Sequence, residues 1–144
     1  MPCHRAGRGR HPLILIGAGT GVGPLVGITR ANHRRRPISL YVGLRHPDSD
    51  HLYRDDLQTW LADGRLSHLS LATSRSQPRR HVQDALRDDA DHLRAAVLRG
   101  ARIMVCGGRD MAAGVTAALN DVLQPLGITV AQLKADERHV EDVY

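Results

Sequence analysis

The sequence predicts a single α/β domain in which a doubly wound, mostly parallel, five-stranded sheet carries helices on both faces. The first observation is length, because 144 residues correspond to about one domain. The second is composition: 42% of residues are hydrophobic but only 3% are aromatic, which indicates an aliphatic core. The third is order, because short apolar runs alternate with longer amphipathic segments, as in βαβ units around a parallel sheet.

The domain is expected to span residues 13–144, because residues 1–12 have no hydrophobic periodicity and resemble a tail or a truncated linker. The apolar run Leu13–Ile16 predicts the first strand. A glycine-rich turn, Gly17–Gly23, follows it. Pro24 is expected to open a helix that runs to about Arg34, since its missing N–H costs nothing in the first helical turn.

Further strands and helices alternate through the middle of the chain. The β-favouring residues of Ile38–Leu44 predict the second strand. Asp50–Leu61 has a helical apolar stripe, and Gly64 is a plausible C-cap beyond it. Weak alternation predicts a third strand over Ser67–Ala72, and Val82–Arg99 is expected to be helical with a break near Asp89.

The last third repeats the same alternation. Gly100 is expected to stop the preceding helix, and Ile103–Cys106 is the fourth strand. Met111–Leu123 is the next helix, which Gly127 ends, and Val130–Asp136 is expected to add a last short helix. The pattern gives no position for a fifth strand, although a sheet of this Rossmann-like type is expected to have one.

Composition excludes several classes of protein. No apolar run approaches the ~20 residues of a membrane span, and no secretory signal is visible. Cys3 and Cys106 form neither a disulfide framework nor a zinc set, so no metal is expected and a reducing cytoplasm is the expected location. The net charge of +5 raises the question of nucleic acid, but aromatic residues are few and Arg34–Arg36 and Arg79–Arg80 are separated in sequence.

Ligands of such sheets bind beyond the carboxyl ends of the strands, which selects the four loops that follow the predicted strands. The first, Gly17–Pro24, combines close backbone approach with a helix N-terminus and suits a pyrophosphate. It is not the dinucleotide fingerprint G-x-G-x-x-G, because position 22 is Val, and it lacks the Gly-Lys-Ser/Thr of a P-loop.

The other three loops also hold residues suited to a nucleotide. Arg45 stands where an NAD-binding unit carries an acid for the ribose 2′-OH, and a cation there favours phosphate. The third loop concentrates a hydroxyl, guanidinium groups and an imidazole, although a solvated basic loop is the alternative. In the fourth loop, Cys106 is either a reactive thiol or an inert buried hydrophobe, and Asp110 could be only an N-cap.

Taken together, the four loops resemble the NADP-binding half of the ferredoxin–NADP reductase family. The closer resemblance is to its diflavin branch, which includes sulfite reductase flavoprotein and cytochrome P450 reductase. It covers about residues 13–144. Five motifs agree in order: Gly17–Pro24 as Gly-x-Gly-Thr-Gly-x-x-Pro; Tyr41–Arg45 followed by Leu52-Tyr53; Ser74-Arg75, Arg79 and His81–Gln83; Val105–Gly107 with Met111-Ala112; and the terminal Asp142–Tyr144.

The resemblance implies a role for each matched position. Cys106 would lie near the nicotinamide C4, Asp142 would support hydride transfer there, and Tyr144 would shield the flavin ring, although a frayed terminus is the alternative for this last residue. His81 stands where the family usually has Tyr. The residues implied to bind the cofactor are Gly19, Thr20, Gly21, Arg45, Ser74, Arg75, Arg79, His81, Gln83, Gly107 and Met111, with Ser74, Arg75 and Arg79 on the 2′-phosphate.

The family's flavin-binding barrel, which precedes this kind of domain, is not found in the sequence. The resemblance therefore implies an NADP(H)-binding module that positions NADPH for hydride transfer to FAD held by another domain or chain. The downstream electron acceptor is not encoded here. The alternative is a non-catalytic module that binds or senses NADP(H).

Overall fold

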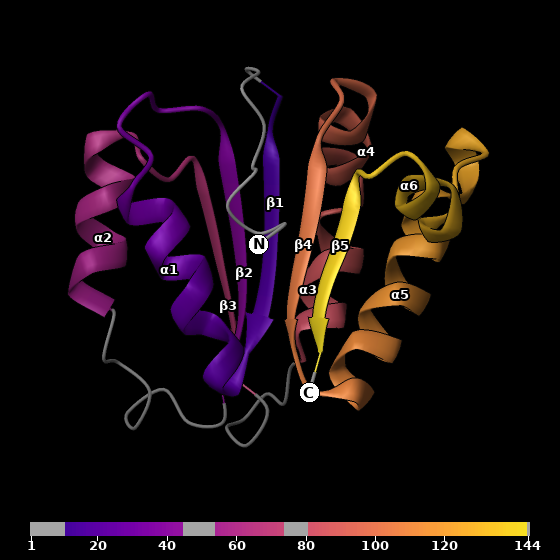
Figure 1. Ribbon diagram of the computed structural model, residues 1–144, viewed down its shortest axis with the longest axis horizontal. Coiled ribbons are helices and arrows are strands. Elements are labelled where there is room, and N and C mark those ends of the chain that lie inside the picture. The colour runs from indigo at the N-terminus through magenta and orange to yellow at the C-terminus, as the bar shows by residue number, and fades with distance from the viewer. Residues whose placement is uncertain (1–10, 45–53, 74–80, 144) are drawn as a thin grey trace.

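The computed structural model describes residues 11–44, 54–73 and 81–143, apart from the side chain of Thr20. The strands and helices alternate along the chain (Figure 1). In order they are β1 (Leu13–Ala18), α1 (Val22–Arg30), β2 (Ile38–Leu44), α2 (Arg54–Asp63), β3 (His68–Thr73), α3 (Val82–Asp88), α4 (Ala90–Leu98), β4 (Arg102–Gly107), α5 (Arg109–Leu123), α6 (Val130–Ala135) and β5 (His139–Val143), with short 3-10 turns at Gly19–Gly21 and Gln124–Leu126.

The five strands form one sheet in the order β3-β2-β1-β4-β5, and every neighbouring pair is parallel. The predicted α/β class is therefore confirmed. The fifth strand, which the sequence pattern did not locate, is β5 at the edge of the sheet beside β4. The chain moves outward from β1 to β3 and then returns to place β4 on the other side of β1. The β1–β4 boundary is thus the switch point at which ligands of such sheets bind.

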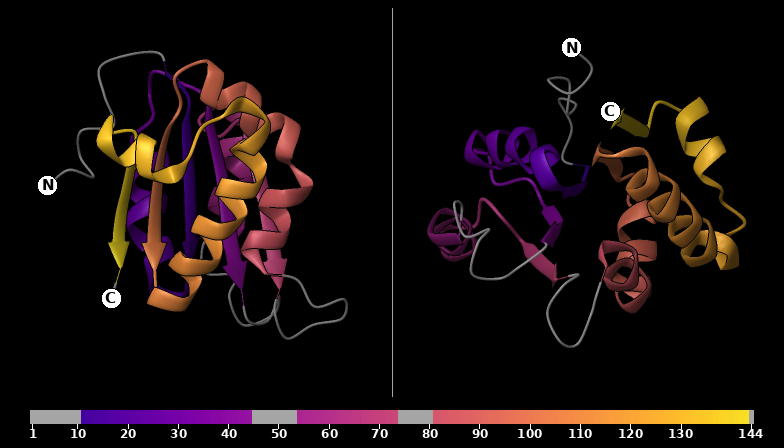
Figure 2. Two further views of the ribbon diagram at one scale, coloured as in Figure 1. Left: turned by 90° about the vertical axis from the view of Figure 1, so that its right-hand side faces the viewer. Right: turned by 90° about the horizontal axis from the view of Figure 1, so that it is seen from below.

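Helices cover both faces of the sheet, with α1 and α2 on one face and α3 to α6 on the other (Figure 2). Each face buries its own apolar cluster. Leu15, Leu40 and Val26 belong to the cluster beneath α1, whereas Ile14, Ile103 and Leu119 belong to the cluster beneath α5. The core is aliphatic, as the composition predicts.

Several element boundaries differ from the prediction by a few residues. The first helix begins at Val22, so that Pro24 is its third residue, and it ends at Arg30 rather than near Arg34. It ends early because the Asn32 side-chain amide donates to the carbonyl oxygens of Arg36 and Arg65, at 2.9 and 2.8 Å, which draws the chain into a turn. The other differences are of one or two residues, in β1, β3 and β4 and in α2, α4, α5 and α6. The predicted start of the second helix, at Asp50, lies outside the described residues.

The predicted break at Asp89 and the predicted stops at Gly64, Gly100 and Gly127 are confirmed. Asp89 lies between α3 and α4 with φ −97° and ψ 25°, and its carboxylate binds Tyr41 Oη at 3.0 Å and His68 Nε2 at 2.7 Å. Gly64, Gly100 and Gly127 have φ of 87°, 91° and 69°, the left-handed conformation that favours glycine. No helix in the described ranges is both long and apolar enough to cross a membrane.

Candidate nucleotide-binding site

The glycine turn after β1 lies directly against the end of β4. Gly19 has φ 60°, which a residue with a side chain rarely adopts. A Cβ atom at Gly21 would overlap the carbonyl oxygen of Cys106 and lie 2.9 Å from the Gly107 nitrogen. The turn leads into α1, whose first turn contains no acidic residue. Backbone amides and a helix N-terminus therefore meet at the switch point, an arrangement suited to a phosphate group.

A second glycine brings the ends of β2 and α3 to the same place. A Cβ atom at Gly43 would lie 3.3 Å from Ala18 Cβ and 3.7 Å from Val82 Cβ. Gly43 thus lets the β1 turn, the end of β2 and the start of α3 approach one another. His81, the exposed N-cap residue of α3, uses its backbone N–H to donate to Asp84 Oδ2 at 2.9 Å.

Three strands align a further set of residues across the switch point. Gly17 of β1 is the register partner of Cys106 in β4, which in turn is the register partner of Asp142 in β5. Cys106 is only 2% exposed and belongs to the apolar cluster on the α1 face. Asp142 is exposed. The sequence-predicted Cys106 and Asp142 are therefore neighbours, and the thiol is covered within the protein.

The side chains of Met111 and Gln83 occupy the space beside Gly107 and Gly114. A Cβ atom at Gly107 would lie 2.9 Å from Met111 Cε. The amide of Gln83 packs over α5, with Nε2 2.9 Å from the position of a Cβ at Gly114. The suggestion that Asp110 caps α5 is wrong: the N-cap is Gly108, and Asp110 lies in the first turn of the helix.

Several predicted residues lie outside the described ranges. They are Arg45, Ser74, Arg75, Arg79 and Tyr144, and for Thr20 only the backbone is described. Their assignments remain predictions. Within the described ranges, no group of three or more His, Cys, Asp or Glu side chains is arranged to hold a metal ion.

Sequence reasoning missed a polar cluster on β5. Glu141 Oε1 lies 3.0 Å from His139 Nε2 and 3.2 Å from Lys134 Nζ of α6. Burial lowers the pKa of His139 more than Glu141 raises it, and the imidazole donates from Nε2 to the carboxylate. Burial would raise the pKa of Glu141, but the contacts with His139 and Lys134 prevail and lower it. The alternating pattern His139, Glu141, Val143 was the available signal.

The cluster borders a shallow cavity of about 380 Å³ between α5, α6 and β5. It is lined by Arg109, Ala112, Ala113 and Thr116 of α5 and by Val143 of β5. Glu141 and Lys134 also line it, and their ion pair joins α6 to the edge strand that carries Asp142.

Comparison with known proteins agrees with this geometry. Residues 15–117 match the family model of the oxidoreductase NAD-binding domain. NADPH–cytochrome P450 reductase of Homo sapiens is 38% identical over 125 residues, which cover 81% of this chain and 18% of that protein. Methionine synthase reductase of Rattus norvegicus is 31% identical over 162 aligned positions, which cover 92% of this chain and 23% of that protein.

The chain spans about a fifth of the length of these relatives. The family match covers more than half of the chain and includes the β1 turn, the end of β2, the start of α3 and the end of β4. The chain therefore belongs to the oxidoreductase NAD-binding domain family.

Proposed function

We propose that this chain is the NADP(H)-binding module of a flavin-dependent oxidoreductase, and that it positions NADPH for hydride transfer to FAD held by another domain or chain. The observation that carries the proposal is the seating of Gly21 against the Cys106 carbonyl. It joins the phosphate-binding turn to the strand end that would lie beside the nicotinamide. The names of the relatives, which specify NADPH or reductase, support it.

The described residues fit a dinucleotide. Gly19 and Gly21 expose backbone in this turn, since Gly19 is left-handed and Gly21 has no room for a Cβ atom. The N-terminus of α1 is positive and lacks a competing carboxylate in its first turn. When bound, NADPH supplies a hydride, and the protein contributes binding and orientation.

The proposal assigns each group of site residues to one part of the nucleotide or flavin. The backbone of residues 19–21 binds the pyrophosphate, and Arg45 adds a cation to it. Ser74, Arg75 and Arg79 bind the 2′-phosphate, while His81 and Gln83 border the adenosine end. Gly107 and Met111 shape the nicotinamide end, where Cys106 and Asp142 orient the ring and Tyr144 covers the flavin until the nicotinamide takes its place.

The partner and the location are also proposals. The partner is a flavin-binding domain, either in the same polypeptide or in another chain, and the final electron acceptor belongs to that larger assembly. A cytoplasmic location fits a sequence whose two cysteines provide no disulfide framework.

Titration of the chain with NADP⁺ and NAD⁺, followed by addition of a flavin domain from a relative, tests the proposal. Preference for NADP⁺ together with NADPH oxidation in the mixture supports it. Binding of NADP⁺ without oxidation by any cognate flavin domain favours a module that only binds or senses the nucleotide. Absence of binding to either nucleotide, with and without the flavin domain, contradicts the proposal.

A further inference from the structure

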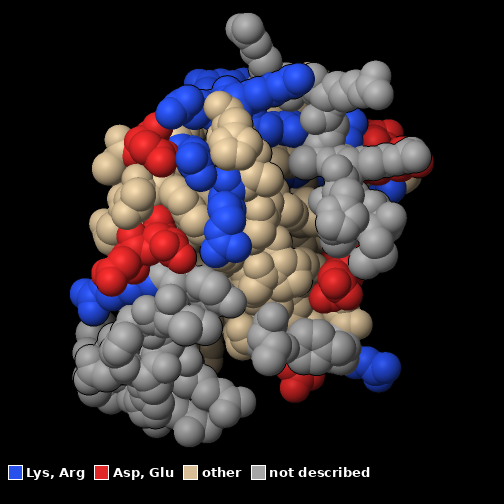
Figure 3. Space-filling model, turned by 60° about the vertical axis from the view of Figure 1, so that its left-hand side comes forward, with Lys and Arg blue, Asp and Glu red and all other residues tan. Residues whose placement is uncertain are grey.

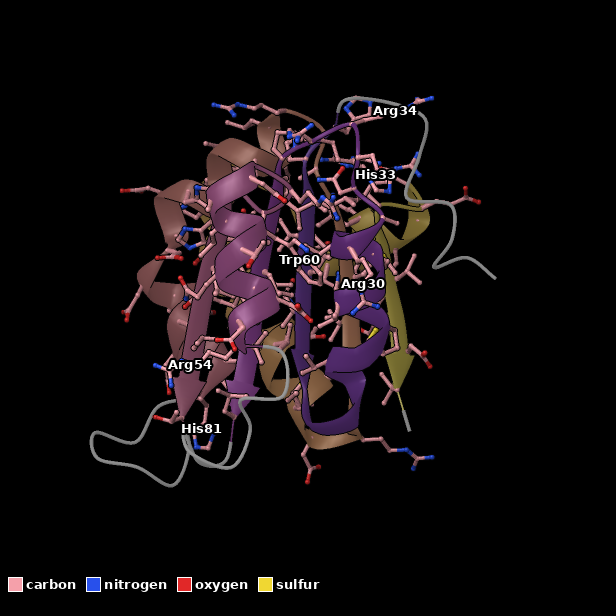
Figure 4. The ribbon with its side chains drawn as sticks, turned by 90° about the vertical axis from the view of Figure 1, so that its left-hand side faces the viewer. Arg30, His33, Arg34, Arg54, Trp60 and His81 are labelled. Atoms are coloured by element: carbon pink, nitrogen blue, oxygen red, sulfur yellow. The ribbon has the colours of Figure 1, made fainter. Side chains whose placement is uncertain are left out.

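Arginines from separate loops gather at the end of the molecule opposite the proposed nucleotide site. We call them the arginine ridge: Arg34, Arg35, Arg36, Arg65, Arg99, Arg102 and Arg138. Because all five strands are parallel, the loops that precede β2, β3, β4 and β5 lie together at the amino ends of the strands. Figure 3 shows Lys and Arg gathered toward this upper end, and Figure 4 places Arg34 there with His81 at the other end.

Hydrogen bonds connect one half of the ridge. Arg65, before β3, donates from Nη1 to the Arg30 carbonyl oxygen at 3.0 Å, at the end of α1. Arg35, before β2, donates from Nε to the Asp63 carbonyl oxygen at 2.8 Å, at the end of α2. These two guanidinium groups therefore lie across adjacent loops.

A second series of contacts continues past β1 to β5. Arg36 donates from Nε to the His11 carbonyl oxygen at 3.0 Å, and His11 Nδ1 lies 3.2 Å from the Arg99 carbonyl oxygen. The Arg102 backbone N–H donates to the Pro12 carbonyl oxygen at 3.0 Å. Arg138 Nε reaches the Ala101 carbonyl oxygen at 3.2 Å. These contacts bring the segments before β2, β4 and β5 together at the amino ends of the strands.

Several ridge arginines make structural hydrogen bonds, and three of the seven are also exposed to solvent. Arg65 and Arg138 donate to carbonyl groups at the C-termini of α1 and α4, where a cation complements the helix dipole. Arg34, Arg35 and Arg99 are exposed. Burial lowers the pKa of Arg36, and the nearby charge of Arg102 lowers it further, so like charges are held together here.

One exposed apolar residue adjoins the ridge in the sequence. Leu98, the last residue of α4, is 68% exposed and immediately precedes Arg99. Protein partners combine an apolar contact with arginine, whereas affinity for nucleic acid comes chiefly from phosphate neutralisation. Leu98 therefore favours a protein over a nucleic acid as the partner of this surface.

The length and charge of the ridge suit one kind of protein surface. Five parallel strands ~4.8 Å apart extend ~19 Å across the sheet, and ridge arginines precede β2, β3, β4 and β5. A helix rises ~5.4 Å per turn, and acidic residues three or four positions apart recur at nearly that spacing on one face. We propose that the arginine ridge is a docking surface for an acidic helix of a partner protein, independent of the nucleotide site.

The test uses a fluorescent helical peptide of about 18 residues, ~27 Å long, with one leucine and with glutamates along one face. A second peptide has the same composition with the glutamates distributed around the helix. Binding is measured by anisotropy to the whole chain and to the double variant Arg34→Gln/Arg99→Gln. The matched control is Arg54→Gln/Arg87→Gln, which removes the same charge at exposed positions on α2 and α3.

We expect the ridge variant to bind the one-faced peptide roughly fivefold to tenfold more weakly, because two exposed ion pairs are lost, while the control changes less than about twofold. Leu98→Ser should also weaken this peptide, and NADP⁺ binding should be the same in every variant. Equal weakening by both double variants, or equal affinity for both peptides, overturns the proposal. Tighter binding of a duplex DNA of similar length, unaffected by Leu98→Ser, would show a nucleic-acid surface instead and also overturns it.

Discussion

Gly21 lies so close to Cys106 that any side chain at position 21 would overlap the Cys106 carbonyl group. This contact couples the turn after β1 to the end of β4 across the switch point of the sheet. Replacing Gly21 by Ala should therefore displace the turn, which lowers both the free energy of unfolding, by ~1–3 kcal/mol, and the affinity for NADP⁺.

The control for Gly21→Ala is Gly27→Ala in α1. A Cβ atom at Gly27 meets nothing within 4 Å, and the position is exposed. This change should raise the free energy of unfolding by ~0.5–1 kcal/mol and leave NADP⁺ binding intact. Urea unfolding measures stability, and calorimetry measures NADP⁺ affinity. If Gly21→Ala binds NADP⁺ with normal affinity, the turn is not part of the binding site.

Replacing Arg75 or Arg79 by Ala should weaken NADP⁺ binding more than NAD⁺ binding. A charge-assisted hydrogen bond to the 2′-phosphate contributes ~1.5–3 kcal/mol, which corresponds to roughly tenfold to a hundredfold in affinity. Arg87→Ala on α3 is the comparison, because its guanidinium pairs with Asp121 at 3.2 Å. Equal losses for NADP⁺ and NAD⁺ would place Arg75 and Arg79 elsewhere on the nucleotide.

Replacing Cys106 by Ser or Ala should lower hydride transfer to a supplied flavin domain while NADP⁺ affinity stays nearly constant. Cys106 is a register partner of Asp142 but is covered by its neighbours. Single-turnover oxidation of NADPH and calorimetry separate the two effects. If both variants lose binding and stability but transfer at the normal rate once saturated, Cys106 serves only packing.

The stability of the fold should decrease as the pH falls below about 6.5, the ordinary pKa of histidine. In the folded protein, burial lowers the pKa of His92, and nearby His68 lowers it further against the opposing charge of Asp89. Burial also lowers the pKa of His139. The imidazoles therefore bind protons at a higher pH in the unfolded chain than in the folded chain. The free energy of unfolding is highest above about pH 6.5 and decreases as the pH falls below it.

Urea unfolding between about pH 7.5 and pH 5 measures that dependence. His139→Gln, at a buried position, should flatten it most, and His92→Gln should flatten it less, because the His92 side chain is exposed. An unchanged slope in both variants would show that other groups control the acid response.

The arrangement of strands and helices could be predicted because each apolar run and turn glycine acts locally. Gly64, Gly100 and Gly127 end their elements as predicted, since only the left-handed conformation closes those turns. The end of α1 could not be predicted, because it depends on hydrogen bonds from Asn32 to Arg36 and Arg65, one of which crosses 33 residues of sequence.

Part of the candidate site could also be predicted from the sequence. The four loops were identifiable because strand ends of a parallel sheet share one edge. The contact of Gly21 with Cys106 required the strand order, and the Glu141 cluster required the position of β5. The arginine ridge was equally hidden, because Arg36 and Arg102 are far apart in sequence and meet only through the sheet.

Calorimetric titration of the chain with NADP⁺ and NAD⁺ at one fixed salt concentration tests the central claim most directly. We predict clear binding of NADP⁺ with a preference over NAD⁺, and loss of that binding in Gly21→Ala. Equal binding of both nucleotides would contradict the 2′-phosphate site. Failure to bind either one, with a flavin domain present as well as absent, would contradict the proposed function.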